Sequence, residues 1–189
     1  MTDILHALDL PPNEAALPDD LRHYFARCRE KLGYVPNVLA SYAFDAAKLQ
    51  AFVAFYNDLM LAASPLTKLE REMIAVVVSS ANRCFYCLTA HGAAVRQLSG
   101  DAILGEQLVM NYRSARLDAR TRAMLDFAHR LTTDSAAIED ADREALRAVG
   151  FDDRAIWDIA AVAAFFNMTN RMASAVDMRP NDAYHVQAR

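Results

Sequence analysis

Two cysteines, a histidine and a glutamate stand close together in the middle of this 189-residue chain. Cys84 and Cys87 are separated by two residues. His91 follows Cys87 by four residues, and Glu72 precedes the group. The CxxC spacing allows one thiolate to attack a peroxide or an oxidised sulfur while the other thiol resolves the product as a disulfide. The pattern therefore predicts redox chemistry on thiols.

The thiols and the histidine are expected on one helix, from about residue 84 to 98. At about 100° per residue, Cys84, Cys87 and His91 fall within a sector of about 60°. The free N–H groups and the dipole of the first turn would stabilise a thiolate there. His91 is the expected proton acceptor. Glu72, on the preceding helix beside an apolar run, is the carboxylate expected to orient the imidazole in a partly dry pocket.

The same residues leave other interpretations open. All four suit zinc, although three ligands within two helical turns make tetrahedral closure awkward. Covalent haem attachment is excluded, because its histidine must directly follow the second cysteine. An ion pair with Lys68 would explain Glu72 without chemistry. Cys28, the third cysteine, is expected to be a half-buried helical thiol without a role.

Length and composition indicate one globular domain. The chain has 189 residues, of which 54% are hydrophobic and 23% charged, and a formal charge of −4. This balance argues against disorder and against a nucleic-acid partner. The first 30 residues lack the pattern of a signal peptide, and no uncharged stretch reaches the roughly 18 residues of a membrane span. We therefore expect a cytoplasmic protein without a membrane partner, in which a CxxC is catalytic or metal-binding rather than structural.

Helical spacing of apolar residues runs through nearly the whole chain, which has only five glycines. The pattern favours an all-α fold, a single-domain bundle of about eight helices without a sheet. Thr67 followed by Glu70 forms a capping box and predicts a helix start. The other expected boundaries are a start at Pro18-Asp19, an end at Gly33, an apolar stretch from 38 to 61, a break at Asn82-Arg83, an end at 99–101, a start at Leu117-Asp118 and a last long helix from 153 to 175.

Two segments of the chain show a weak internal similarity. Residues 67–87 are a capped apolar helix that ends in N-x-C-x-x-C, and residues 152–170 are a capped apolar helix that ends in Asn167-Met168-Thr169-Asn170. This similarity is consistent with an internal duplication whose second copy has lost its thiols. Asn167 and Asn170 are expected to satisfy backbone groups.

Glu72, eleven intervening residues and then C-x-x-C-x-x-x-H ending at His91 resemble the alkylhydroperoxidase D-like group of the carboxymuconolactone decarboxylase superfamily. Three further motifs narrow the resemblance to the uncharacterised peroxidase-related branch. They are Gly33-Tyr34-Val35-Pro36-Asn37, the stretch 82–87 and the stretch 166–171. The similarity spans about residues 20–180 of a domain assigned to residues 1–189.

The resemblance implies an all-helical fold, homo-oligomers and an antioxidant reduction of organic hydroperoxides by a dithiol, without a cofactor. It implies that Cys87 is the peroxidatic thiol, that Cys84 is its resolving partner and proton donor, and that Glu72 and His91 relay protons. The reductant would be a thiol or a lipoyl-bearing protein. A non-redox activity, as in the lactone decarboxylases, or an oligomeric binding role is the remaining alternative, although those decarboxylases lack the cysteine pair.

The chain departs from this family pattern at Tyr86, since well-studied members have a histidine between the cysteines. A phenol, with a pKa near 10, donates a hydrogen bond but is no base at pH 7. Tyr86 is therefore an accessory candidate, and that part of the relay is altered.

Overall fold

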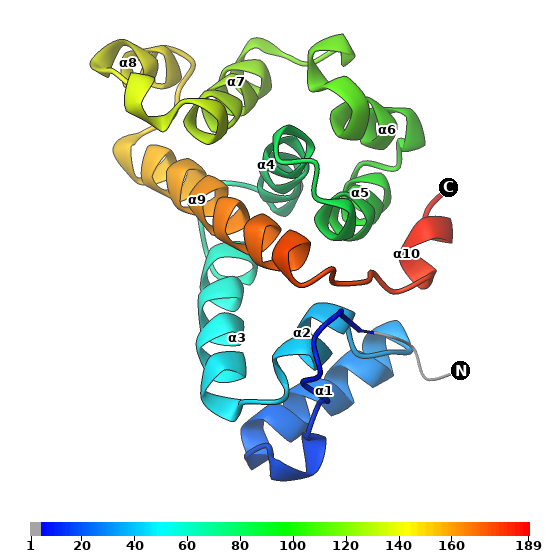
Figure 1. Cartoon of the computed structure of the whole chain (residues 1–189). Coiled ribbons are helices and arrows are strands. Elements are labelled where there is room, and N and C mark those ends of the chain that lie inside the picture. Colours follow the sequence, from blue (N-terminus) through cyan, green and yellow to red (C-terminus); the bar gives the residue numbers. More distant parts are fainter. Residues whose placement is uncertain (1–4) are drawn as a thin grey trace.

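Helix α4 (Lys68–Ala81) is the central helix of the structure, a computed structural model that describes residues 5–189. It contacts α5 (Phe85–Ser99), α6 (Ala102–Asn111), α7 (Ala119–Thr133) and α9 (Asp153–Ala175) (Figure 1). Every residue of α4 from 73 to 79 is buried. Valine is a weak helix former by a few tenths of a kcal/mol, but full burial of its side chain contributes about 1.5–3 kcal/mol. Packing therefore decides the conformation of this segment.

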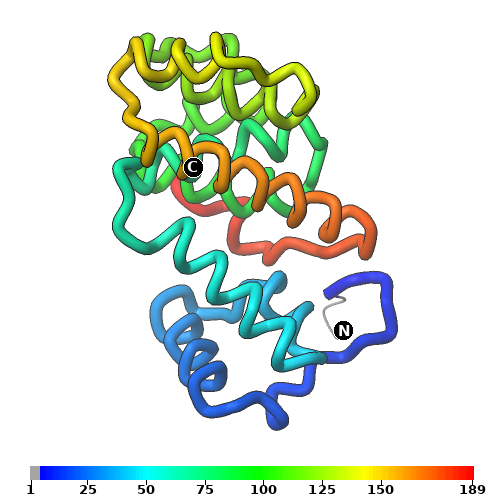
Figure 2. The backbone as a smooth tube through the Cα atoms, turned by 90° about the vertical axis from the view of Figure 1, so that its left-hand side faces the viewer, coloured from blue at the N-terminus to red at the C-terminus, as the bar shows by residue number. Residues whose placement is uncertain are grey.

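Helices α1 (Asp19–Leu32), α2 (Asn37–Tyr42) and α3 (Ala46–Leu61) form the lower part of the molecule in Figure 1. Helix α3 joins this part to the rest, because it contacts α2 on one side and α4 and α9 on the other (Figure 2). Gly33, with φ at +84°, ends α1 and accepts the left-handed conformation that other residues adopt only with strain.

The remaining helices are short. They are α8 (Asp140–Ala148) and α10 (Ala183–Val186), together with 3-10 turns at Glu14–Ala16, Tyr112–Ser114 and Ser135–Ala137. The expected all-α fold is confirmed. Eight of the ten described α-helices have nine residues or more, which agrees with the expected number. Within residues 5–189, no helix has both the length and the apolar character needed to cross a membrane.

Most helix boundaries follow the capping signals. Thr67 and Glu70 form both hydrogen bonds of the capping box, and Asp118 and Asp152 cap α7 and α9. Two expectations were incomplete. The apolar stretch 38–61 is divided by Asp45, whose carboxylate accepts from the backbone N–H groups of Ala47 and Lys48 and starts α3. Helices α6 and α8, which no boundary signal had marked, fill the remaining segments.

The C-terminal segment is held against α5 by a buried arginine. Arg96 is 5% exposed and donates to the carbonyl oxygens of Tyr184 (2.9 Å) and Gln187 (3.0 Å). Gly105 of α6 makes room for it, because a Cβ atom there would lie 2.5 Å from Cγ of Arg96. The close approach of α6 to α5 at Gly105 therefore leaves Arg96 in position to bind the segment that contains α10.

Candidate active site

The CxxC pair lies where the chain turns from α4 into α5. Asn82 ends α4, and Arg83 has a left-handed φ of +54°, so the chain reverses within two residues. Cys84 is the N-cap of α5, and its φ and ψ of −83° and 104° are not helical. Cys87 is the third residue of α5. Both sulfurs thus lie at the end of a helix that has free N–H groups.

The expected helix from 84 to 98 therefore begins one residue later than predicted. Because Cys84 adopts extended backbone angles, its side chain does not follow the helical register that placed it on one face with Cys87 and His91. The prediction of a single face was wrong for Cys84.

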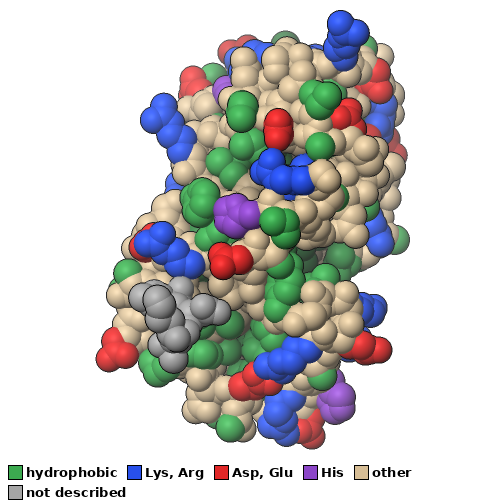
Figure 3. All heavy atoms as spheres, turned by 90° about the vertical axis from the view of Figure 1, so that its right-hand side faces the viewer, with side chains coloured by type: hydrophobic (Ala, Val, Ile, Leu, Met, Phe, Trp, Pro, Cys, Tyr) green, Lys and Arg blue, Asp and Glu red, His purple; other side chains and the backbone are tan. Residues whose placement is uncertain are grey.

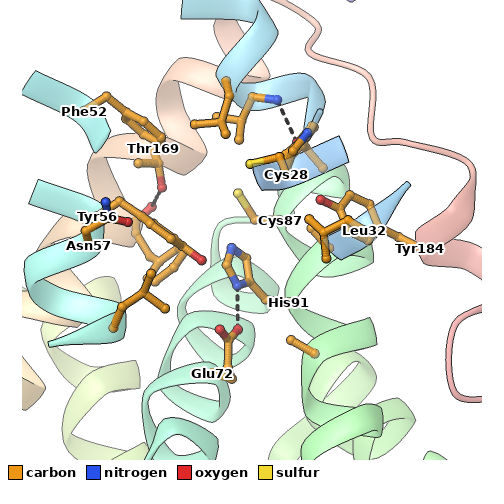
Figure 4. A pocket seen from close by; sticks show the side chains of 18 of the residues that line it. Cys28, Leu32, Phe52, Tyr56, Asn57, Glu72, Cys87, His91, Thr169 and Tyr184 are labelled. Carbon is orange, nitrogen blue, oxygen red and sulfur yellow. Dashed lines mark hydrogen bonds and ion pairs between the residues drawn. The ribbon is translucent and has the colours of Figure 1, made fainter. Parts of the chain in front are cut away.

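Glu72 and His91 form a close pair between α4 and α5. His91 Nδ1 lies 2.6 Å from Glu72 Oε2, and the two side chains are 14% and 13% exposed. The ring also packs edge-on against Phe166, with 4.6 Å between centroids. A carboxylate accepts a hydrogen bond at this distance, so Nδ1 carries the hydrogen that is donated and Nε2 can act as an acceptor. Figure 4 shows the imidazole between Glu72 and Cys87. Glu72 pairs with this histidine rather than with Lys68.

The two thiols are free, buried and hydrogen-bonded to each other. This hydrogen bond from Cys87 lowers the pKa of Cys84 to about 6, against the opposing effect of burial. Backbone N–H groups of the first helical turn and the hydroxyl of Ser174 contribute to the same lowering. The same bond to Cys84, followed by burial, raises the pKa of Cys87. The shared hydrogen bond thus favours the thiolate form of Cys84 and the thiol form of Cys87.

Cys87, His91 and Glu72 line a cavity of about 990 Å³ between α1–α3 and the helices α5 and α9. Hydrophobic side chains gather at the hollow between the two parts of the molecule (Figure 3). Six of the seven tyrosines of the chain line this cavity: Tyr24, Tyr34, Tyr42, Tyr56, Tyr86 and Tyr184. A largely apolar wall with several tyrosine side chains suits an organic molecule rather than an ion.

Cys84 does not line this cavity. It opens instead to a smaller pocket of about 180 Å³ together with Ser174 of α9. The two cysteines, although only two residues separate them, therefore face different spaces.

Comparison with known proteins places the chain in a family. The model of the carboxymuconolactone decarboxylase family matches residues 46–103, which span α3 to α5. An "uncharacterized peroxidase-related protein" of Silicibacter sp. TM1040 is 68% identical, with a TM-score of 0.94, and the match covers 98% of this chain and 96% of that one. A second protein of that description, with an alkylhydroperoxidase AhpD core and from Ralstonia eutropha JMP134, is 44% identical, with a TM-score of 0.93 over 98% of this chain and 97% of that one. The chain belongs to the peroxidase-related branch of the carboxymuconolactone decarboxylase family.

A more distant structure shows how widely the fold extends. The debrominase Bmp8, in a complex with 2,3,4-tribromopyrrole, is 19% identical to this peroxidase-related chain, with a TM-score of 0.79 over 95% of each chain. At this identity the likeness concerns the fold alone. No curated protein matches the chain.

In this peroxidase-related protein, Tyr86 closes the wall beside the thiols. Its hydroxyl oxygen accepts a hydrogen bond from the backbone N–H of Val38, at 2.8 Å. Burial raises its pKa further above the ordinary phenol value. The side chain is thus a fixed, neutral part of the wall that ties α5 to α2.

Three contributors to the cavity and its thiols were missed from the sequence. Asn170 and Thr169 of α9 hydrogen-bond the Cys87 thiol and oppose the rise in its pKa. Asn170 also receives a hydrogen bond from Asn82 and donates to Ser79, so it binds side chains rather than the expected backbone groups. Cys28, expected to have no role, lies on the wall that α1 forms, and burial raises the pKa of its thiol.

The zinc interpretation finds no support in the geometry. Within residues 5–189, no three side chains of the histidine, cysteine, aspartate and glutamate types lie close enough together to hold a metal ion. Cys84, moreover, lines a pocket that neither Glu72 nor His91 lines.

Proposed function

We propose that this chain is a thiol peroxidase that reduces organic hydroperoxides through Cys84 and Cys87. The observation that carries the proposal is the position of Cys87. This thiol faces a large apolar cavity beside the His91–Glu72 pair, and a second thiol lies in hydrogen-bonding contact behind it.

The first step oxidises Cys87. Nε2 of His91 accepts its proton, while Glu72 balances the imidazolium charge. The Cys87 thiolate attacks the distal oxygen of the hydroperoxide, the O–O bond breaks and Cys87 becomes a sulfenic acid. His91 returns the proton to the alkoxide, which leaves as the alcohol.

The second step closes the disulfide. The Cys84 thiolate attacks the sulfur of the Cys87 sulfenic acid, and hydroxide leaves as water after taking a proton from solvent. One hydroperoxide and one proton are consumed, one alcohol and one water are released, and two thiol sulfurs are oxidised. A thiol reductant, on a small molecule or on a lipoyl-type protein, restores the pair.

A thiol count during titration with cumene hydroperoxide tests the proposal. The reduced protein should lose two thiols per chain at one equivalent, and mass spectrometry should locate the new bond between Cys84 and Cys87. A Cys87→Ser variant should lose this reaction, whereas Cys28→Ser should keep it. Unreactive thiols in the wild-type protein, or a Cys87→Ser variant that consumes peroxide at the wild-type rate, would contradict the mechanism.

We also propose that the chain forms homo-oligomers. Exposed apolar side chains lie on α3 and α9, with Phe55 48%, Trp157 72% and Met168 43% exposed. Apolar surface of this kind is typical of contact between subunits. Light scattering during gel filtration should give a multiple of the 21.0 kDa chain mass, and a monomer at micromolar concentration would contradict this.

A further inference from the structure

Two of the motifs noted in the sequence, residues 82–87 and 166–171, meet inside the protein. Asn82 lies where α4 ends, and Asn167 and Asn170 lie on α9. Nδ2 of Asn82 donates to Oδ1 of Asn167 and to Oδ1 of Asn170, both at 3.0 Å. Asn170 is only 1% exposed. A buried amide costs free energy unless its donors and its acceptor are paired, so the partners of Asn170 show what it holds in place.

The amide of Asn170 has one possible orientation. Its nitrogen donates to Oγ of Ser79 at 2.9 Å, and this hydroxyl donates its own hydrogen to the carbonyl oxygen of Ala75 at 2.6 Å. A hydroxyl has one hydrogen, so Oγ of Ser79 can only accept from Asn170. The nitrogen of the amide therefore faces Ser79, and its oxygen faces Asn82.

The neighbouring amide of Asn167 fixes the same orientation independently. Its nitrogen donates to the carbonyl oxygen of Ala163 and to Oγ1 of Thr132, both at 3.0 Å. A backbone carbonyl only accepts, so the oxygen of Asn167 is the atom that is left to face Asn82. Asn82 thus presents its nitrogen, and Asn170 must present its oxygen to that nitrogen.

One hydrogen of the Asn170 amide remains after these bonds are counted. An amide nitrogen carries two hydrogens, and Ser79 accepts one of them. The Cys87 sulfur is also in hydrogen-bonding contact with Asn170, so the second hydrogen can go to this sulfur. Asn170 does not line the large cavity. A substrate bound in the cavity therefore does not compete for the contact.

We propose that Asn170 is a catalytic residue that donates a hydrogen bond to the Cys87 sulfur while this sulfur carries negative charge. Ser79 and Asn82 are positioning residues that turn its nitrogen towards the sulfur. The inference rests on the proposed function, in which His91 removes the Cys87 proton. A hydrogen bond to an ionised group is about twice as strong as one between neutral groups, so the contact strengthens as the thiolate forms.

Asn170 differs in one respect from the other groups around this sulfur. In the proposed reaction His91 takes up and returns a proton, and Cys84 becomes part of the disulfide. The amide gains and loses no proton. It remains the same donor before, during and after attack on the O–O bond, and the charge that it stabilises passes from the sulfur to the alkoxide.

Cys87 can be studied alone in a Cys28→Ser, Cys84→Ser background, because the chain has three cysteines. Iodoacetamide reacts with the thiolate rather than the thiol. The pH dependence of alkylation, followed by mass spectrometry, therefore reports the ionisation of Cys87. His91 and Glu72 stay unchanged in every variant compared.

Asn170→Leu removes the donor with little change in side-chain size. Asn82 and Ser79 each keep another hydrogen-bond partner. The midpoint of alkylation against pH should rise by about one pH unit, so alkylation below the midpoint should be about tenfold slower. The rates at the high-pH plateau should agree within about twofold, since a lost donor changes how much thiolate is present and a general loss of structure would also change the plateau.

Asn167→Leu is the matched control. It removes an amide of the same network, one helical turn from Asn170, whose nitrogen bonds Thr132 and Ala163. Its midpoint should stay within about 0.3 pH unit of the background protein. Asn170→Ala, which leaves space instead of an apolar group, should reproduce the rise seen with leucine. Equal midpoints in the Asn170 variants and the control would overturn the proposal.

Oxidation by cumene hydroperoxide separates this inference from the proposed function. In the chain with all three cysteines, Asn170→Leu should lower the oxidation rate at least about tenfold, and Asn167→Leu should leave it within about twofold. Thiols that do not react with the peroxide would contradict the proposed function alone, because alkylation needs no peroxide. A wild-type oxidation rate in Asn170→Leu would overturn the role of Asn170 and leave the peroxidase in place.

Discussion

Cys84 and Cys87 differ in charge because their surroundings differ, although both are buried cysteines at one helix end. Cys84 accepts hydrogen bonds from the Cys87 thiol, from backbone N–H groups and from Ser174, and all of these favour its thiolate. The same bond with Cys84, followed by burial, raises the pKa of Cys87 and favours its thiol form. The pair is thus prepared for attack by Cys87 only when a base removes that proton.

Removal of the base should slow oxidation strongly. General base catalysis contributes about 10²–10⁴-fold, so His91→Ala should lower the rate of Cys87 oxidation by cumene hydroperoxide at least 100-fold. Glu72→Gln should lower it less, because the amide still orients the ring but does not balance its charge. Glu70→Gln is the matched control, since Glu70 belongs to the capping box and does not line the cavity. A wild-type rate in His91→Ala would contradict the relay.

The lowered pKa of Cys84 should appear as pH-dependent stability. Its folded value of about 6 lies below the ordinary thiol value of 9.0. The stabilisation is therefore fully present above about pH 9 and is lost as the pH falls through about 6. The pKa of Cys87 is raised, so its proton stays bound in this window.

Urea unfolding between pH 6 and 9 measures this effect. The difference in unfolding free energy between wild type and Cys84→Ala should grow with pH. Cys28→Ala should show no such growth, because burial raises the pKa of Cys28. A difference that is constant with pH would mean that Cys84 stays protonated in the folded chain.

Part of the site follows from the sequence and part does not. The pairing of Glu72 with His91 was predicted, because each lies on a helix with a clear apolar register. The bond from Val38 to Tyr86 joins residues 48 positions apart, and local spacing carries no signal for such a contact. The orientation of Cys84 depends on one backbone angle pair, which periodicity does not specify.

At the scale of helices, capping residues define the structure more sharply than hydrophobic spacing does. Thr67, Gly33 and Gly100 are found at the ends that they predicted. Asp45 supplied an equally good signal, but the continuous apolar sequence around it concealed the break between α2 and α3. Helix ends are set by hydrogen bonds and backbone angles of a few neighbouring residues, and so they can be predicted from the local sequence.

Gly100 offers a test of this argument. It ends α5 with a φ of +67°, and no heavy atom would lie within 4 Å of an added Cβ. Substitution should thus act through backbone strain alone. Gly100→Ala should lower the free energy of unfolding by about 1 kcal/mol, and Gly100→Asn by less, since asparagine tolerates this conformation. Urea unfolding of both variants measures the difference, and equal stabilities would show that strain is absent.

At the scale of the whole molecule, the cavity forms only when helices from distant parts of the chain pack together. Its walls come from α1, α2 and α3 on one side, and from α4, α5, α9 and the segment around α10 on the other. Single elements could be predicted, but the cavity depends on how α3 joins the two parts, which no motif encodes. The same reason explains why Cys28 was not recognised as part of the wall.

Arg96 should control the attachment of α10. Hydrogen bonds to a charged group contribute about 1.5–3 kcal/mol each, and Arg96 donates two to the C-terminal segment. Arg96→Met keeps an aliphatic stem beside Gly105 but removes both bonds. Amide hydrogen exchange in residues 183–188 should become at least 100-fold faster.

The helical core should remain folded in Arg96→Met. Arg143→Met is the control, because Arg143 makes an exposed ion pair with Asp140 on α8, away from the C-terminal segment, and such pairs contribute at most about 1 kcal/mol. Unchanged exchange in Arg96→Met would show that α10 is held by other contacts.

The distance along the chain between the CxxC pair and α10 has a consequence for biosynthesis. About 100 residues lie between the second thiol of the CxxC pair and Gln187 at the cavity wall. At roughly 5–20 residues per second, the ribosome needs roughly 5–20 s to add them. For most of this interval Cys28, Cys84 and Cys87 are all present on a nascent chain in which α9 is not complete and α10 has not been made. During this interval the unfinished cavity wall does not separate the three thiols from one another.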